Sequence, residues 1–348
     1  MERSFSRRNL LKAGLGTAAL GVASVPQKSF GAPKYKWRMQ THWPTGVGYY
    51  KPLYEGFCGL VKQATAGQVE ITPLPSGAIV PTKDVFEAVG RGLFEIAWSF
   101  PAYHIGKVPV AGHFNGMPFG WENFEETFVW LDKMGGRDII QKAYAEQGLY
   151  SLPGQPVSGV TVYSKKAIKN IEDFKGLKIR STGVVAEVFK KAGATPVFFP
   201  GEELYQALQT GVCDAAHWGS VSAGWDMRFQ EVTKFIIRPY FGNITNCEIF
   251  VNLNTWNKLP PDLKAIIEQA AYTNAVNSIA WFLHHDYVRM KEFQEKKMGQ
   301  ISWMTEETIK TLRKYSLEVV DEYSKKDPKY CAPAGNLLKE LLKSAGRI

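Results

Sequence analysis

The sequence predicts an α/β protein of two domains that are braced by one long helix. Three observations point to it: strand and helix patterns alternate near the N-terminus, a helix–glycine–strand segment occurs twice, and a long stretch without Gly or Pro follows Pro261. The 348 residues are enough for two domains with separate hydrophobic cores. The content of 45% hydrophobic and 22% charged residues is ordinary for a globular chain.

The first predicted unit consists of a strand, a helix and a second strand. Residues 37–42 have a strand pattern that ends in a turn at 43–46, a helix is expected from about 50 to 64, and a second strand is expected over 69–74. This order of elements is typical of a layered α/β domain with parallel strands.

A similar unit is expected in the second half of the chain. Residues 86–97 and 205–216 each contain a helix end, a Gly suited to a left-handed cap, and a short strand with one acidic residue. Trp98 and Trp218 follow these strands. Only three positions are identical, so chance similarity stays open. In α/β folds ligands bind beyond the carboxyl ends of the strands, which predicts that both Trp side chains face a cleft.

The C-terminal third of the chain predicts helices. Residues 262–298 contain no Gly or Pro and keep apolar residues at helical spacing. As one helix this stretch would be about 55 Å long, which is enough to brace two domains. Two further helices are expected at 305–325 and 336–344, packed as a cover.

The N-terminus predicts export. Residues 6–12 read SRRNLLK, a twin-arginine motif, and the weakly apolar run that follows, 13–25, is too short for a stable membrane anchor. Small residues favour cleavage after Gly31, and no Cys lies near this point for lipid attachment. Cleavage would lower the formal net charge from +9 to +5, because five basic residues and one acid are lost. This mild balance suits an anionic ligand and gives no nucleic-acid footprint.

The motifs of several enzyme classes are absent or misplaced. The dinucleotide-type glycine pattern at 14–19 lies inside the export signal, and at 220–224 a Ser stands where a nucleophile elbow needs its first Gly. For His284 and His285, a solvated or capping role is favoured over metal binding. The four Cys fit no metal-binding spacing, and export leaves their pairing open. The sequence therefore gives little basis for an enzyme.

Several segments together resemble one protein family. They are the twin-arginine leader, FKGLKIR at 174–180, LYQALQTG at 204–211, and WNKLP at 256–260 before the long helix. The chain resembles the substrate-binding proteins of tripartite ATP-independent periplasmic (TRAP) transporters over essentially its whole mature length. The resemblance implies an α/β, two-domain periplasmic binding protein (type II-like) with hinge strands and a long domain-spanning helix. The expected division is a signal peptide at 1–31, domain I at 32–155 and about 246–292, and domain II at 156–245 and about 293–348.

The same resemblance implies the main ligand contact. Arg180 matches the family Arg that pairs with the substrate carboxylate, and a planar guanidinium offers two parallel donors for this pairing. The branch that binds 2-oxo acids, lactate and other carboxylates has a Trp that Trp218 matches. His217 stands where that branch often has Glu, and it either donates a hydrogen bond to the ligand or simply packs.

The resemblance also raises the question of a bound Na or Ca ion. Trp218, Asn243 and Gln155 would hold it, but Asn243 falls where the family has Glu, and Ser158, three residues after Gln155, falls where the family has Gln. A hard cation prefers carboxylate oxygen, so the ion is in doubt.

Further candidate ligand contacts come from the predicted loops. His42 lies in the first strand-to-helix loop, Trp98 and Phe100 follow the repeated strand, and Ser181 is next to Arg180. Each aromatic residue could equally belong to the core. Several of them together would form an apolar pocket with few polar anchors, which suits a compact or aromatic acid.

The sequence thus predicts a periplasmic receptor without enzymatic activity. It would bind a small organic acid anion, most simply a monocarboxylate, and deliver it to the small and large membrane subunits of a TRAP transporter. A sulfonate or an aromatic acid is the alternative ligand, and an exported enzyme or a sensor of similar fold is the alternative function. A homodimer through the C-terminal helices stays open, and no nucleic-acid partner is expected.

Overall fold

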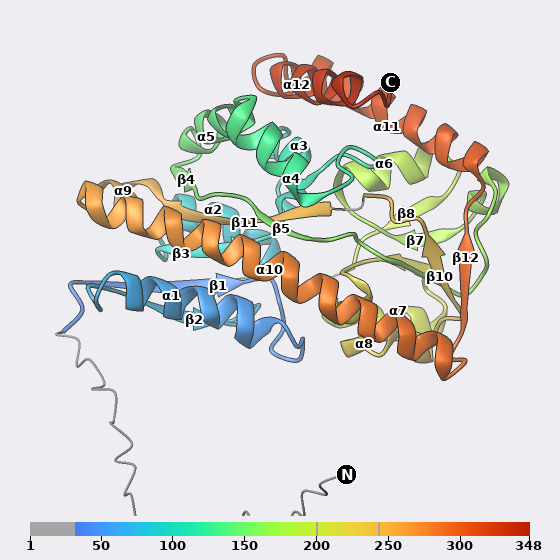
Figure 1. Cartoon of the computed structure of the whole chain (residues 1–348), viewed down its shortest axis with the longest axis horizontal. Coiled ribbons are helices and arrows are strands. Elements are labelled where there is room, and N and C mark those ends of the chain that lie inside the picture. The colour runs from blue at the N-terminus through green and yellow to red at the C-terminus, as the bar shows by residue number, and fades with distance from the viewer. Residues whose placement is uncertain (1–31, 200, 243) are drawn as a thin grey trace, which may run out of the picture.

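The computed structural model describes residues 32–199, 201–242 and 244–348. Within them the chain forms two six-stranded sheets covered by helices, and α10 (Pro261–Glu295) runs across both (Figure 1). The predicted leader at 1–31 and the candidate residue Asn243 lie outside the described residues.

The first sheet has the order β2–β1–β3–β11–β4, and β5 pairs with β11 beyond this path. Its strands are β1 (Tyr35–Thr41), β2 (Val69–Leu74), β3 (Ile96–Ser99), β4 (Leu149–Ser151), β5 (Gln155–Ser158) and β11 (Ile244–Asn252). β1 is parallel to β2 and β3, whereas β11 is antiparallel to β3, β4 and β5. The predicted strand–helix–strand unit is present: a π-helical turn, η2 (Tyr50–Glu55), leads into α1 (Gly56–Ala64) between β1 and β2.

The second sheet has the order β12–β10–β6–β9–β7–β8. Its strands are β6 (Val162–Ser164), β7 (Lys178–Arg180), β8 (Thr195–Val197), β9 (Ala215–His217), β10 (Phe235–Arg238) and β12 (Gln300–Trp303). β7 lies parallel to both β8 and β9. Three helices belong to this half: α6 (Gly183–Lys191), α7 (Leu204–Thr210) and α8 (Val221–Asp226).

The predicted repeat is present in the backbone. α2 (Val85–Gly90) and α7 each precede a Gly with positive φ, Gly92 at +79° and Gly211 at +82°, and a short strand follows each. Gly adopts this left-handed conformation without the steric cost that a Cβ would bring. The repeat therefore marks corresponding helix-to-strand turns in the two halves.

The chain passes between the two sheets three times: from β5 to β6, from β10 to β11, and from α10 to β12. All nine residues of β11 are buried. The first half of β11 pairs with β5, and its second half pairs with β3 and β4. β5 and β11 thus form a paired ribbon at the junction of the two halves.

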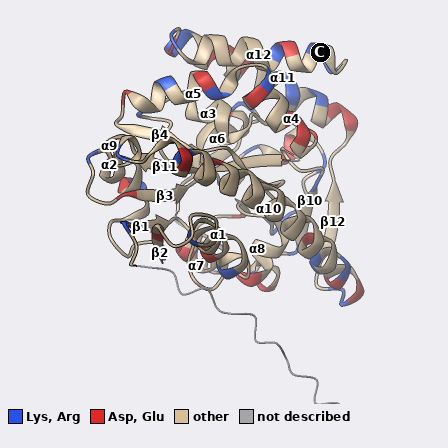
Figure 2. Ribbon diagram, turned by 60° about the vertical axis from the view of Figure 1, so that its left-hand side comes forward, with Lys and Arg blue, Asp and Glu red and all other residues tan. Residues whose placement is uncertain are grey.

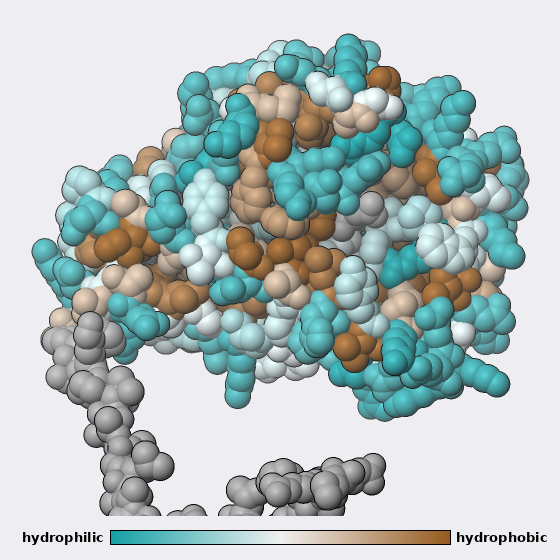
Figure 3. Space-filling model, in the orientation of Figure 1, coloured by the Kyte–Doolittle hydropathy of each residue, from teal (hydrophilic) through white to brown (hydrophobic). Residues whose placement is uncertain are grey.

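Helix α10 confirms the expected brace. It packs against α1 and β5 and, further along, against α8 (Figure 1). Its buried residues include Leu263, Ile267 and Ala271 in the first half and Ile279 and Phe282 in the second. The exposed face is partly apolar, with Val276 and Val288 accessible, and brown residues lie along the helix in Figure 3.

The C-terminal helices form the expected cover. α11 (Glu306–Lys326) packs on α6, and α12 (Cys331–Ser344) packs on α11, α3 and α5. The remaining helices are α3 (Ala111–Asn115), α4 (Phe124–Phe128), α5 (Gly136–Ala145) and α9 (Leu253–Asn257). α12 begins five residues earlier than the sequence predicted, because Pro333 lies in its first turn, where a missing N–H costs no hydrogen bond.

The surface carries charges of both signs. Figure 2 shows Lys, Arg, Asp and Glu interspersed over the outer helices. No helix within the described part of the chain is long and apolar enough to cross a membrane. The four Cys, all of them in that part, are buried and free.

Candidate functional site

A cavity of about 80 Å³ lies between the two sheets. This is more than the roughly 10–15 Å³ that a single water molecule needs, so the cavity has room for a compact ligand. The first half of the chain contributes aromatic side chains, the second half contributes Arg180 and its neighbours, and β11 contributes its first residues. The lining includes the side chains of His42, Trp43, Phe100, Tyr103, Arg180, Thr182, His217, Trp218, Ser220 and Thr245.

Arg180 is the last residue of β7 and is 2% exposed. Its Nε donates to the carbonyl oxygen of Phe199 at 3.0 Å, and its Nη1 donates to the carbonyl oxygen of His217 at 3.0 Å. Its buried Nη2 has no hydrogen-bond partner within the described residues. Two backbone carbonyls therefore fix the guanidinium plane, and the Nη2 amino group is left for a ligand. An unpaired buried donor of this kind costs about 1–3 kcal/mol, more for a charged group, which favours an anion at this position.

Tyr103 ends the short helix η4 (Pro101–Tyr103) of the first half and lies beside Arg180 of the second. Burial raises the pKa of Tyr103, and the Arg180 charge acts in the opposite direction. Tyr103 also lines an outer recess, as do His42 and Phe198. The Phe198 ring is 5.5 Å from the Arg180 Cζ atom and is 53% exposed. Tyr103 thus lines both the inner cavity and the outer recess.

The two cavity histidines are neutral. Burial lowers the pKa of His42 to about 3, with the Arg180 charge adding to this and a backbone hydrogen bond opposing it. His42 Nδ1 lies 3.3 Å from the Trp98 carbonyl oxygen, which can only accept, so Nδ1 carries the proton and Nε2 is an acceptor. Burial first, and Arg180 second, lowers the pKa of His217 to about 3. Arg180 is therefore the sole charged group among the described lining residues.

These histidines predict that ligand affinity is independent of pH between pH 5 and 8. Neither ring takes up a proton in this range, and a carboxylic acid stays ionised there. Calorimetric titrations at pH 5, 6, 7 and 8 should give dissociation constants within about threefold of one another. A tenfold weakening toward pH 8 would show instead that a protonated His holds the ligand.

Fold stability should behave differently from affinity. The folded pKa values of His42 and His217 lie below the ordinary 6.5, and burial lowers the pKa of His113 to about 4. At these three histidines the unfolded chain therefore binds more protons than the folded chain below pH 6.5. The contribution that these neutral histidines make to the free energy of unfolding is complete above pH 6.5 and is lost as the pH falls toward 3. The melting temperature should therefore decrease across that window.

The predicted contacts differ in where the structure places them. His42, Phe100, Arg180, His217 and Trp218 line the cavity. The His217 ring is also packed edge-on against Phe189 and Phe241, so packing and cavity lining occur together. Ser181 lies behind His217, with its Oγ 3.4 Å from His217 Nδ1, and is not part of the lining.

Trp98 does not face the cleft, contrary to the prediction from the repeat. It is fully buried and packs against Tyr54 and Phe57 of the helix that covers the first sheet. Trp98 lies inside β3, where it pairs with Thr41 and Ile249, whereas Trp218 is one residue past the end of β9. At the offset of 119 between the two units Trp98 corresponds to His217, and Trp218 lies one residue further along, so the two Trp side chains have different surroundings.

The side chain of Gln155 makes its hydrogen bonds to neighbouring parts of the fold. It is fully buried, and its Nε2 donates to the carbonyl oxygens of Pro153 and Ala271, at 2.9 and 3.1 Å. Its Oε1 accepts from Asn274 at 3.0 Å. Gln155 lies outside the cavity lining, so this arrangement does not support a direct ligand contact.

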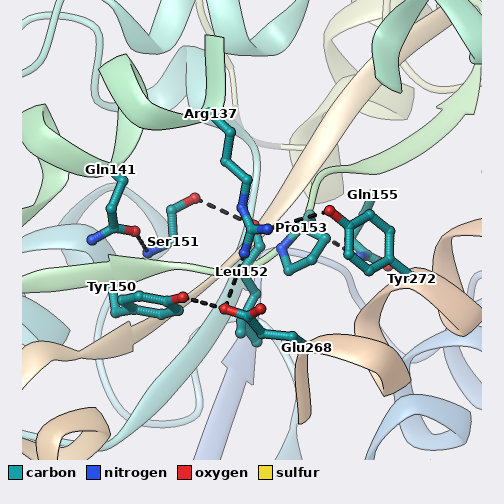
Figure 4. A network of polar contacts seen from close by, with 9 residues as sticks. All are labelled: Arg137, Gln141, Tyr150, Ser151, Leu152, Pro153, Gln155, Glu268 and Tyr272. Atoms are coloured by element: carbon teal, nitrogen blue, oxygen red, sulfur yellow. Dashed lines mark hydrogen bonds and ion pairs between the residues drawn. The ribbon is translucent and has the colours of Figure 1, made fainter. Parts of the chain in front are cut away.

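A polar network holds α10 next to Gln155. Figure 4 shows Arg137 of α5 reaching Glu268 and Tyr272 of α10, with nitrogen–oxygen distances of 3.1 and 3.2 Å. Tyr150 of β4 donates to the same Glu268 carboxylate. The first sheet and the long helix are therefore joined by charge-assisted contacts around the start of β5.

Sequence reasoning missed Tyr103 and Thr245 as cavity residues. Tyr103 follows Phe100 in the same loop, and this proximity was the only available signal. Thr245 lies on β11, a strand whose place at the junction follows from long-range pairing and has no local signature.

The chain matches a known family model over residues 39–327, described as the bacterial extracellular solute-binding proteins, family 7. A monocarboxylate 2-oxoacid-binding periplasmic protein of Nostoc sp. (strain PCC 7120) is 29% identical over 331 residues, covering 92% of this chain and 90% of the relative.

Solved structures of similar proteins agree with this match. A TRAP periplasmic solute-binding protein of Pseudoalteromonas atlantica with bound sodium and pyruvate has a TM-score of 0.83 at 25% identity, over 89% of this chain and 94% of that one. A TRAP solute-binding protein of Bordetella bronchiseptica, a mixed-occupancy dimer with copurified calcium and picolinate, has a TM-score of 0.83 at 26% identity. The coverage is 90% of this chain and 94% of that one. The predicted two-domain α/β fold of a TRAP solute-binding protein is thereby confirmed.

Proposed function

The chain belongs to the bacterial extracellular solute-binding proteins of family 7, and from this premise we propose that it is a receptor for a small monocarboxylate. The observation that carries the proposal is the buried Nη2 donor of Arg180, which lacks a partner within the described residues and borders the cavity. A carboxylate oxygen supplies the missing acceptor. The Nostoc relative is described as binding monocarboxylate 2-oxo acids, and the Pseudoalteromonas structure holds pyruvate, which agrees with this ligand class.

The size and the walls of the cavity support a compact ligand. A cavity of about 80 Å³ suits an acid with a short carbon chain. Trp43, Phe100 and Trp218 present aromatic surface to the part of the ligand that bears no charge. A small aromatic acid is the second candidate, because these rings could stack on it and the Bordetella structure holds picolinate.

The two halves of the chain meet around this cavity in a closed arrangement. The Gly48 N–H donates to the Asp226 carboxylate of α8 at 2.8 Å across the cleft. Gly183, at φ +63°, approaches η4 so closely that a Cβ there would lie 2.8 Å from the Ala102 Cβ. Binding energy that favours this closed form would present it to the membrane subunits of a TRAP transporter.

The lining residues favour binding over catalysis. Ser222, at the nucleophile position of the elbow-like pattern, has its Oγ 2.9 Å from the Oγ of Ser220, which caps α8 by accepting from the Ala223 N–H. No His accompanies it as a general base in these contacts. The proposed role is therefore capture and delivery, after export through the twin-arginine route and without a lipid anchor.

A thermal-shift screen tests the proposal. The mature protein, freed of copurified ligand, should be melted with 2-oxo acids, 2-hydroxy acids, aromatic acids and sulfonates. A ligand at a hundred times its Kd adds about 2.7 kcal/mol to stability, or roughly 5 °C in melting temperature for a chain of this size. A shift of that order from short monocarboxylates is expected. If every acid class leaves the melting temperature unchanged, the receptor proposal fails.

A further inference from the structure

Sodium and calcium accompany the ligands in the two solved structures described above. The donor set of this chain differs from what such an ion requires. We propose that this cavity holds its acid as a single negative charge directly on Arg180, without a metal ion as an intermediary. The inference rests on the proposed receptor function and adds the charge class of the ligand and its independence from cations.

The first observation is the composition of the cavity wall. Its described lining contains no Asp or Glu side chain. Sodium and calcium are hard cations that favour carboxylate oxygen, supplemented by carbonyl oxygens and water. The described residues also contain no cluster of three or more His, Cys, Asp or Glu side chains that could hold a metal ion. Arg180, whose charged donor faces the same space, repels a cation.

The second observation concerns Gln155, the amide predicted to share a cation. Its Oε1 is the atom that could bind a metal, and this oxygen already accepts from Asn274 of α10. Its Nε2 donates to the carbonyl oxygen of Pro153, just before β5, and to the carbonyl oxygen of Ala271 in α10. Reorienting this fully buried amide toward the cavity would break these hydrogen bonds and leave buried polar atoms unpaired.

The third observation concerns the buried acids near the junction. Asp286 accepts from the Ser158 hydroxyl at 2.6 Å and from the Ser222 N–H at 2.8 Å, one donor for each oxygen. The Ser158 hydroxyl is therefore engaged by Asp286 and does not face the cavity as a cation ligand. Ser158 stands at the position where the resemblance places the family Gln. Glu248 accepts from the Tyr144 hydroxyl at 2.6 Å and pairs with His104. Neither acid lines the cavity.

Charge balance then selects the ligand. One guanidinium and one carboxylate neutralise each other inside the cavity. An added cation, or a second carboxylate on the ligand, would leave an unpaired charge away from water, which is strongly unfavourable. The cavity should therefore prefer singly charged acids over dicarboxylates of similar size and should not require a cation.

The experiment is a titration of the full mature protein with pyruvate and lactate under two ionic conditions. In the first, protein and ligand are passed over chelating resin and studied in a choline buffer with EDTA and without sodium. In the second, the chelator is left out and the buffer contains 100 mM NaCl and 1 mM CaCl₂. Calorimetry and the fluorescence of the cavity Trp residues report the dissociation constant. We expect the two constants to agree within about threefold, and malonate to bind at least tenfold more weakly than pyruvate in both.

A matched variant shows that the assay can detect a cation. Thr245→Asp places a carboxylate on the cavity wall at nearly constant size, and its melting curve verifies that it folds. Acid binding to this variant should weaken in the chelated buffer and recover at least partly with CaCl₂, whereas the wild type stays indifferent.

The outcomes separate the two proposals. If wild-type binding weakens tenfold or more after chelation and returns with sodium or calcium, the cation-free site is overturned while the receptor function stands. If malonate binds as tightly as pyruvate, the charge selection is overturned. If no acid binds under either condition, the receptor function itself fails.

Discussion

Replacement of Arg180 by Ala should weaken ligand binding by about 3 kcal/mol or more, a loss of over a hundredfold in affinity. The substitution removes the sole cationic group among the described lining residues and leaves a ligand carboxylate buried without a partner. Breaking a buried charge pair in this way costs about 3–5 kcal/mol. Calorimetry with the acid identified by the thermal-shift screen measures the effect.

Two further variants make this result interpretable. Lys178→Ala removes an exposed charge from the same strand and should leave affinity within about twofold. Arg180→Lys keeps the charge but loses the planar donor pair, so an intermediate loss is expected. Because Arg180 also donates to two backbone carbonyls, melting curves of each variant are needed beside the titrations. If both the Arg180→Lys and the Arg180→Ala variants fold and bind the acid with undiminished affinity, Arg180 does not contact the ligand.

Replacement of Asp286 by Ala should lower the free energy of unfolding by about 3 kcal/mol. Asp286 lies on α10 and is 4% exposed, and it joins the helix to Ser158 of β5 and to the N-terminus of α8. The substitution leaves the Ser158 hydroxyl and the Ser222 N–H unpaired, and each buried donor without a partner costs about 1–3 kcal/mol. Urea denaturation of the ligand-free protein measures the loss.

The neighbouring residue supplies the control for this prediction. Tyr287→Ala changes a side chain that is 71% exposed on the same helix and should alter stability by less than about 0.5 kcal/mol. Asp286→Asn keeps one acceptor oxygen, so its loss of stability should lie between those of Asp286→Ala and Tyr287→Ala. Equal stabilities for Asp286→Ala and Tyr287→Ala would show that the contacts of Asp286 contribute nothing to the junction.

Much of the fold follows from local patterns in the sequence. The strand at 69–74 and the two glycine turns at Gly92 and Gly211 were predicted at the right positions, because alternating apolar residues and left-handed glycines act locally. The brace α10 follows from the absence of Gly and Pro between Pro261 and Gly299. The pairing of β11 with β5, β3 and β4 could not be predicted, because it joins segments far apart in sequence and depends on tertiary packing.

The site was predictable to a smaller degree. Arg180 and Trp218 were reached through a family resemblance, and a lone Arg at a strand end has no local property that marks it as buried. Trp98 shows the limit of reasoning from a repeat: it and Trp218 differ by one position in the register of the two units, and successive side chains of a strand point to opposite faces. The hydrogen bonds of Gln155 to α10 could not be predicted either, because its partners Ala271 and Asn274 lie more than a hundred positions away in the sequence.

The three passages of the chain between the sheets also have a kinetic consequence. A molecule enclosed beside Arg180 exchanges with solvent only when the two halves separate, and the connected strands confine that motion to a hinge rotation. The dissociation rate of the ligand is then limited by the rate at which the two halves open. Domain motions of this kind take place on a timescale of about microseconds to milliseconds. Changes in the β5–β11 ribbon, far from the guanidinium, can therefore alter residence time and apparent affinity without altering a single ligand contact.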